Sequence, residues 1–254
     1  MFRQQLAIIG IACVGLLVTD QPIPADEAAS LTTIEELGGR YERDTQRPGK
    51  PVVAVDLNFT HATDAALKAL ADFPDLETLT LDKSQYPHPK RRPIAFPHIT
   101  DAGLKELIGL KHLKSLNLRS NSITDAGLKE LKELTALQSL DLSRTPVTGT
   151  GLTELKELTN LRSLGLGYST TDAGLNALPE LKSLQSLALI EMKVTETSLE
   201  NLESLRGLQS IELRDTPVSA ASLNRLRKAL PDVKIMITAR PLSRDEQIYY
   251  RTGK

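Results

Sequence analysis

Aliphatic residues recur along most of this chain in a six-residue frame, L-x-x-L-x-L. The frame occurs as LETLTL (76–81), LKSLNL (113–118), LQSLDL (137–142), LRSLGL (161–166), LQSLAL (184–189) and LQSIEL (208–213), with VVAVDL (52–57) before it and VKIMI (233–237) after it. Alternating apolar positions are typical of a strand with one buried face. The pattern therefore predicts about eight short strands.

These strands are evenly spaced. The steps between the central aliphatic residues are 24, 37, 24, 24, 23, 24 and 24, counted over Val55, Leu79, Leu116, Leu140, Leu164, Leu187, Ile211 and Ile235. One insertion and one deletion explain the two exceptions. A fixed period of this length indicates a solenoid of stacked repeats rather than a closed globule.

The segment between two strands has the spacing of a short amphipathic helix. In ITDAGLKELKEL (123–134), Leu128, Leu131 and Leu134 fall on one face. Thr124 can cap this helix and Asp125 complements its positive end. We predict a helix of about two turns in each repeat, with its lysine and glutamate side chains in solvent. The equivalent capping positions are Thr63, Thr100, Thr171 and Thr195.

A single repeat of this kind cannot cover its own apolar flanks, so it needs neighbours on both sides. Parallel strands stack more closely than the wider helices behind them, which curves the stack. The predicted fold is therefore an α/β solenoid, a horseshoe with about eight parallel strands on the concave side and short helices on the convex side.

The TDAGL box, joined to the L-x-x-L-x-L frame, resembles the 24-residue leucine-rich repeats of the ribonuclease-inhibitor-like class. The box occurs at 63–67 (as TDAAL), 100–104, 124–128 and 171–175. The chain looks most like the secreted leucine-rich-repeat proteins of planctomycete-type bacteria. This resemblance covers roughly residues 34–237 and implies a binding module that is not an enzyme.

The remaining parts of the chain flank or interrupt the repeats. Residues 1–25 have the layout of a signal peptide, since Arg3 precedes an apolar run over 6–18 that is short for a membrane span. A retained anchor and a lipidated Cys13 are the alternatives. Residues 26–50 are expected to cap the solenoid, with Ile34, Leu37 and Tyr41 in a helical lid. The repeats occupy 51–238, with an insertion at about 83–97, and a polar tail, expected to be mobile, follows at 239–254.

Composition narrows the chemistry. Thirty-one basic and thirty-two acidic side chains give a net charge of −1, which argues against a nucleic-acid partner. The four histidines form no nucleophile–base or metal pattern, and neither a phosphate loop nor an HExxH motif is present. We therefore expect no catalysis, no cofactor and no metal; the pair His88 and His98 lacks a third ligand pattern.

Two sets of residues are candidates for contact with a partner. The first set lies between the buried leucines, on the inner face of the strands or just after the strand ends. Its members are Asn117, Arg119, Asp141, Arg144, Tyr168, Ile190, Glu212 and Arg214. Ile190 is expected to be an exposed aliphatic residue. The second lies in the insertion: Tyr86, Lys90, Arg91, Arg92 and Phe96. Arginine and tyrosine often carry interface energy, but these residues can also be ordinary surface positions, and the insertion an ordinary surface loop.

The sequence thus predicts a secreted or envelope-located monomer that binds a protein or an envelope polysaccharide through its concave face. It would contact a membrane only through an uncleaved N-terminal segment. Two alternatives stay open. One is a structural spacer in the envelope without a discrete ligand. The other is a cytosolic adaptor similar to the substrate-recruiting chains of ubiquitin ligases, although no F-box-like segment precedes the repeats.

Overall fold

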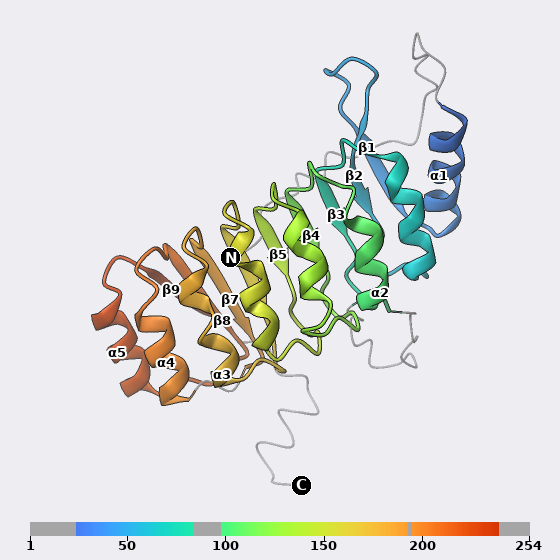
Figure 1. Ribbon diagram of the computed structural model, residues 1–254. Helices are drawn as coiled ribbons and strands as arrows, with labels where there is room; N and C mark the ends of the chain where they lie inside the picture. Colours follow the sequence, from blue (N-terminus) through green and yellow to red (C-terminus); the bar gives the residue numbers. More distant parts are fainter. Residues whose placement is uncertain (1–23, 84–97, 193–194, 239–254) are drawn as a thin grey trace, which may run out of the picture.

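In a computed structural model, which describes residues 24–83, 98–192 and 195–238, the strands form one nine-stranded sheet in chain order. Helices cover one face of this sheet (Figure 1). Eight strands run parallel, with their central aliphatic residues in register, as predicted: β2 (Val52–Asp56), β3 (Thr78–Thr80), β4 (Ser115–Asn117), β5 (Ser139–Asp141), β6 (Ser163–Leu166), β7 (Ser186–Ile190), β8 (Ser210–Arg214) and β9 (Lys234–Thr238). The fold is the leucine-rich-repeat solenoid, with the strands on its concave side.

The N-terminal end of the solenoid is closed by helix α1 (Ala25–Glu36) and by β1 (Arg40–Arg43), which pairs with β2 in antiparallel fashion. Ile34 on α1 is 1% exposed. Tyr41 packs against the core from β1, so its predicted place in a helical lid was wrong. Gly38, with a φ of 79°, lies between the end of α1 and the start of β1.

The outer side of the solenoid is built from short helices. Four are α-helices, α2 (Asp101–Leu104), α3 (Asp172–Leu175), α4 (Glu196–Glu203) and α5 (Ala220–Ala229), and five are 3₁₀ helices, η1 (Asp64–Asp72), η2 (Lys105–Leu107), η3 (Leu128–Glu133), η4 (Thr150–Glu157) and η5 (Leu178–Glu180), in the described chain. The predicted helix of about two turns is therefore a 3₁₀ helix in the central repeats. A 3₁₀ helix rises about 2.0 Å per residue against 1.5 Å, so it covers more of the return path with few residues.

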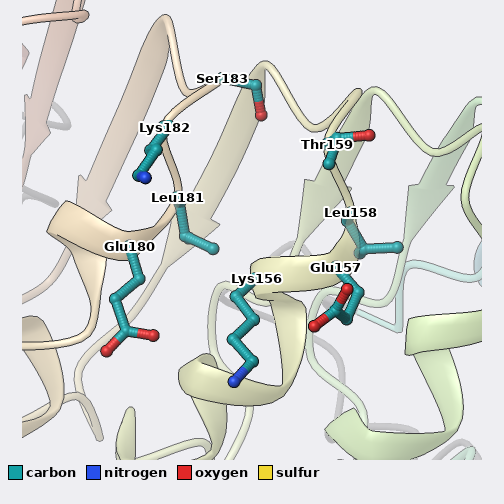
Figure 2. A pocket seen from close by; sticks show the side chains of 8 residues that line it. All are labelled: Lys156, Glu157, Leu158, Thr159, Glu180, Leu181, Lys182 and Ser183. Carbon is teal, nitrogen blue, oxygen red and sulfur yellow. The ribbon is translucent and has the colours of Figure 1, made fainter.

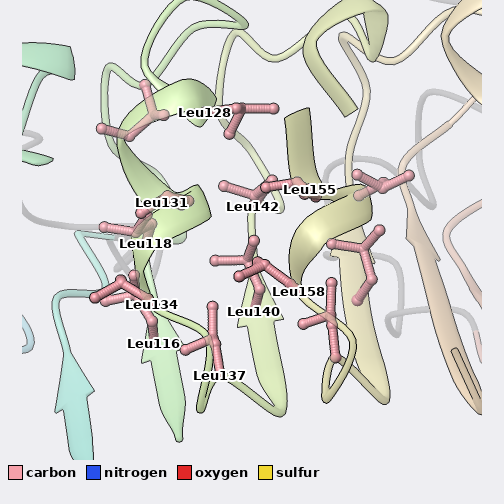
Figure 3. Packing of buried hydrophobic residues seen from close by; sticks show 14 of the residues in the cluster. Leu116, Leu118, Leu128, Leu131, Leu134, Leu137, Leu140, Leu142, Leu155 and Leu158 are labelled. Carbon is pink, nitrogen blue, oxygen red and sulfur yellow. The ribbon is translucent and has the colours of Figure 1, made fainter. Parts of the chain in front are cut away.

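The core is one cluster of buried hydrophobic residues, most of them leucines, that extends from Leu31 to Leu230. Figure 3 shows part of it. Strand leucines such as Leu116 and Leu140 are 1% exposed, and they face Leu128, Leu131 and Leu155 from the helical side, each 0% exposed. Burying one leucine side chain contributes about 1.5 to 3 kcal/mol. Because each leucine is covered partly by the next repeat, the repeats stabilise one another.

A row of side-chain hydrogen bonds also joins consecutive repeats, which the sequence alone did not reveal. The carboxylate of Asp101 accepts from the backbone N–H of Thr124 at 2.8 Å and from its hydroxyl at 2.6 Å. Asp64 accepts the same two bonds from Thr100. The Thr and Asp of the TDAGL box thus link neighbouring repeats, in addition to the capping role predicted for the threonine, which Thr124 also fills toward Ala126.

Candidate binding surface on the concave face

The register of the strands brings several predicted residues into one row across the concave face. Asn117 lies opposite Asp141, Asp141 opposite Gly165, and Ala188 opposite Glu212. Arg214 lies beside Ile190 at the carboxyl ends of β7 and β8. The nearly constant repeat length sets this register.

Most of the polar candidates on this face already have partners within the chain. The side chains of Asn117 and Asp141 each accept a hydrogen bond from the backbone N–H two residues later, at 3.0 and 2.8 Å. The Arg119 guanidinium lies 4.0 Å from the carboxylate of Asp82, and its side chain is only 15% exposed. These contacts shape the strand ends, which leaves these side chains less available to a partner.

Glu212 and Arg214 have the same character at the C-terminal end. The Glu212 carboxylate is 1% exposed and accepts hydrogen bonds from the Arg214 guanidinium at 3.0 and 2.6 Å. The hydroxyl of Thr238, one strand further, also reaches it at 3.3 Å. A buried carboxylate needs such partners, so the Glu212–Arg214 pair has a structural role in the sheet.

The prediction that Ile190 is an exposed aliphatic was wrong, because its side chain is only 4% exposed. The equivalent position two repeats earlier, Ser143, is 0% exposed, and Gly167 between them is also buried. Glu191 takes a positive φ of 58°, so the chain turns immediately after Ile190. The alternation of buried and exposed side chains along the strand therefore does not extend to Ile190, at the end of β7.

The remaining candidates, Arg144 and Tyr168, lie together at this edge. Arg144, Tyr168 and Glu191 occupy equivalent positions in three consecutive repeats, two residues after the last strand leucine. The Arg144 Nε lies 2.9 Å from Oε1 of Glu191, and its Nη2 also donates to that oxygen. This ion pair joins the two repeats on either side of Tyr168, whose own side chain is 56% exposed.

Two glycines make this arrangement possible. A Cβ at Gly167 would lie 2.5 Å from the backbone nitrogen of Arg144, and a Cβ at Gly165 would lie 2.7 Å from Oδ1 of Asp141. A side chain at Gly167 would displace the backbone of the preceding repeat, whereas one at Gly165 would displace the Asp141 carboxylate. We name the group Asp141, Arg144, Gly167, Tyr168 and Glu191 the Tyr168 patch.

A hollow on another side of the molecule offers little chemistry. It lies between the turns that precede β6 and β7, and Figure 2 shows its lining, which consists of Lys156, Glu157, Leu158, Thr159, Glu180, Leu181, Lys182 and Ser183. Two lysines and two glutamates balance in charge, and aromatic side chains are missing from this lining. The hollow is a furrow between consecutive repeats.

Lys83 is a residue that the sequence did not single out. Its side chain is 3% exposed, and its Nζ donates to the backbone carbonyl of Thr60 at 2.8 Å. Burial lowers the pKa of the Lys83 amine to about 8. Lys83 follows the L-x-x-L-x-L frame by two residues, and this position in the sequence does not predict a buried side chain.

Several predictions fall on residues outside the described ranges. These are the insertion candidates Tyr86, Lys90, Arg91, Arg92 and Phe96, the apolar run of the predicted signal peptide, and the tail 239–254. Within the described ranges, groups of three or more histidine, cysteine, aspartate or glutamate side chains that could hold a metal ion are absent. The helices of that same part are all too short or too polar to cross a membrane.

The repeats match a known sequence family. Residues 109–132 and 134–156 match the family model described as Leucine Rich repeat. No curated protein matches the chain in sequence.

Solved structures with similar folds include two internalins of Listeria monocytogenes. Internalin C2 is 20% identical, with a TM-score of 0.48, over 85% of this chain and 93% of its own. Internalin F is 18% identical, with a TM-score of 0.43, over 70% of this chain and 58% of its own. A leucine-rich-repeat protein of Leptospira interrogans is 25% identical, with a TM-score of 0.42, over 66% of this chain and 44% of its own. The matched repeats and the stacked parallel sheet give this chain the leucine-rich-repeat fold.

Proposed function

We propose that this chain is a non-enzymatic module that binds another protein through the Tyr168 patch, outside the cytoplasm. The observation that carries the proposal is the exposure of Tyr168, at 56%, in the repeat between the two ends of the Arg144–Glu191 ion pair. Most other candidates on the concave face are buried or already paired. Among the predicted candidates that the structure describes, Tyr168 is therefore the most exposed large side chain on this face.

The chemistry of the patch suits a protein ligand. Tyrosine and arginine are the residue types enriched among interface hot spots, and tyrosine offers a large contact area with few rotatable bonds. The Arg144 guanidinium is held by Glu191 and is still 33% exposed on its side chain. An arginine that is already oriented loses less side-chain entropy on binding than a free one.

The location and the ligand class rest on the sequence. The apolar run behind Arg3 supports export, and the near-neutral charge supports a protein or an envelope polysaccharide rather than nucleic acid. We expect the mature chain to act as a monomer without a cofactor. Sequencing the N-terminus of the protein from fractionated cells tests export, since an intact residue 1–25 segment on soluble cytosolic protein would contradict it.

Binding is tested with the mature chain and its own cell envelope. A partner captured from that envelope and identified by mass spectrometry is purified, and its affinity for the chain is measured by calorimetry. Tyr168→Ala is expected to weaken binding about 30-fold, which corresponds to a hot-spot loss of about 2 kcal/mol.

Phe59→Ala is the matched control, because Phe59 is 45% exposed at the equivalent position of the first repeat. It is expected to leave the affinity unchanged. Equal losses from both variants, or no loss from Tyr168→Ala, would remove the patch as the binding site. Binding of envelope polysaccharide alone, without any saturable protein partner, would identify the glycan alternative, and no saturable ligand at all would favour the spacer.

A further inference from the structure

Carboxylates outnumber cations at the strand ends of the concave face. The positions equivalent to Asp141, Ser143 and Arg144 in the repeats from β2 to β8 hold six acidic side chains and four basic ones: Asp56, Asp82, Asp141, Glu191, Glu212 and Asp215 against Lys83, Arg119, Arg144 and Arg214. Three of these cations already lie beside a carboxylate of the same set, and Lys83 donates to a backbone carbonyl. This part of the face is therefore suited to a positively charged ligand.

Asp141 is the carboxylate of this set that belongs to the Tyr168 patch. It is half-buried, and one of its two oxygens accepts from the N–H of Ser143 at 2.8 Å. Within the described part of the chain, no cationic side chain pairs with it. Asn117, at the equivalent position of β4, makes the same backbone bond with an uncharged side chain. The turn after the strand therefore does not require the negative charge of Asp141.

Ser143 supplies a second, independent observation. Its side chain is 0% exposed, and its Oγ has no hydrogen-bond partner among the described residues. A buried hydroxyl without a partner costs free energy and is a candidate for contact with a ligand. A Cβ at Gly165 would lie 3.1 Å from this Oγ and 2.7 Å from Oδ1 of Asp141. The two oxygens thus face the same small space over the Gly165 backbone.

We infer that the protein partner of the Tyr168 patch places a lysine or arginine side chain over Gly165. This inference rests on the proposed function, because it names the chemistry of that partner. The cationic group donates to the Asp141 carboxylate and, once that side chain has shifted toward it, to the Ser143 hydroxyl. Tyr168, three residues after Gly165 and 56% exposed, adds an aromatic ring, to which such cations are also attracted.

An acidic partner suits the patch less well. Arg144 is the cation of this patch, and the Glu191 carboxylate already accepts hydrogen bonds from it. An acidic side chain would have to displace Glu191 and would also meet the charge of Asp141. A cation meets neither obstacle, since it leaves the Arg144–Glu191 pair intact.

Asp141→Asn tests the charge with little effect on the fold, because Asn117 shows that asparagine makes the same turn. With the purified envelope partner, calorimetry at low salt is expected to show about tenfold weaker binding for this variant. Asp56→Asn is the matched control. Asp56 lies at the equivalent position of β2 and accepts from the N–H two residues later, and its replacement is expected to leave the affinity unchanged.

The outcomes separate this inference from the proposed function. No loss from Asp141→Asn, or equal losses from both variants, would overturn the cationic contact. If Tyr168→Ala still weakens binding in that case, the patch remains the binding site and only the chemistry of its ligand is wrong. If Tyr168→Ala has no effect, the proposed function fails and this inference fails with it.

Ser143→Ala distinguishes a ligand contact from a structural role. It is expected to weaken partner binding about threefold without lowering the urea midpoint, because it removes an unpaired buried hydroxyl. A lower midpoint with unchanged affinity would exclude Ser143 from the contact.

A small probe tests the contact without the partner. Nα-acetyl-lysine methylamide is expected to shift the NMR resonances of Asp141 and Tyr168, whereas the norleucine analogue, which lacks the ammonium group, is not. Equal shifts from these two probes, or larger shifts from the glutamate analogue, would overturn the inference.

Discussion

Two neighbouring junctions of the solenoid solve the same problem with different chemistry. Between the repeats that start at Thr124 and Thr148, the Asp125 carboxylate accepts four hydrogen bonds, from the hydroxyl and N–H of Thr148 and from the N–H groups of Gly149 and Gly151. At the next junction Gly149 stands in the place of the aspartate. There, the backbone carbonyl of Thr148 accepts from the N–H and hydroxyl of Thr171.

The difference shows that the carboxylate is one way of joining repeats, and not a condition for stacking them. Strands β5 and β6 keep the regular parallel register across the first junction, and β6 and β7 keep it across the second. The junction with Gly149 leaves no room for a side chain at that position, since a Cβ there would lie 2.6 Å from the Cα of Gly174. Leucine packing therefore sets the register, and the polar link adapts to the spacing that results.

The largest expected effect on stability comes from placing the aspartate of the TDAGL box at position 149. Gly149→Asp should destabilise the chain by about 3 kcal/mol or more, because Gly149 has a φ of 99° and its added Cβ would overlap backbone atoms. Urea unfolding measures the change. Gly109→Ala is the control, since a Cβ at Gly109 meets no atom within 4 Å, and a Gly149→Asp variant as stable as the control would contradict the close junction.

Removing a carboxylate that joins two repeats should destabilise the chain less, and the loss should be larger for the carboxylate that accepts more hydrogen bonds. Asp125→Ala should lower the free energy of unfolding by about 3 kcal/mol, and Asp101→Ala, which loses two bonds, by about 2 kcal/mol. The exposed Asp232 provides the control substitution, Asp232→Ala, with a change within about 0.5 kcal/mol. Equal losses for Asp101 and Asp125 would mean that the two additional N–H bonds contribute nothing.

The same junction should make stability depend on pH. Burial raises the pKa of the Asp125 carboxyl, but the hydrogen bonds from Thr148, Gly151 and Gly149 outweigh this and hold it below its ordinary value. The unfolded chain therefore takes up this proton first as the pH falls below about 4. The stabilisation is complete above that pH and is lost as the pH falls through the folded pKa.

Urea midpoints measured from pH 7 to pH 3 check this expectation. The wild-type chain should lose more stability over that range than Asp125→Asn, which cannot bind the proton. Parallel pH profiles for the two proteins would show that Asp125 does not carry the effect.

The smallest effect is expected at the Tyr168 patch. Arg144→Ala breaks an ion pair whose side chains are 33% and 30% exposed, so it should cost about 1 kcal/mol or less. Thermal unfolding measures this change. A loss of more than about 2 kcal/mol would make the pair a structural link like Asp125 and would weaken its assignment to binding.

Much of the fold could be predicted because the same pattern of buried aliphatic positions occurs in every repeat. The steps of about 24 residues between aliphatic residues correctly predicted eight parallel strands and their register. The 3₁₀ geometry of the central helices and the existence of strand β1 were not predicted. Both depend on how much room the neighbouring repeat leaves, and a local pattern does not contain that distance.

The candidate surface was predictable only in part, for a related reason. Alternation along a strand assigned the inner face correctly for residues such as Asn117 and Asp141. It failed at Ile190, where the strand ends and Glu191 turns the chain in the left-handed region. The Arg144–Glu191 pair joins residues 47 positions apart, and only the curvature and the glycines between them bring these side chains together.

By itself, the amino-acid sequence determined the repeat, the identity of the buried leucines and the order of the strands, because apolar burial follows from periodicity alone. The tertiary structure decided which polar side chains form hydrogen bonds between repeats and which side chains, such as that of Tyr168, stay exposed. That division depends on distances between adjacent turns of the solenoid. Those distances arise only when the leucines of one repeat pack against those of the next.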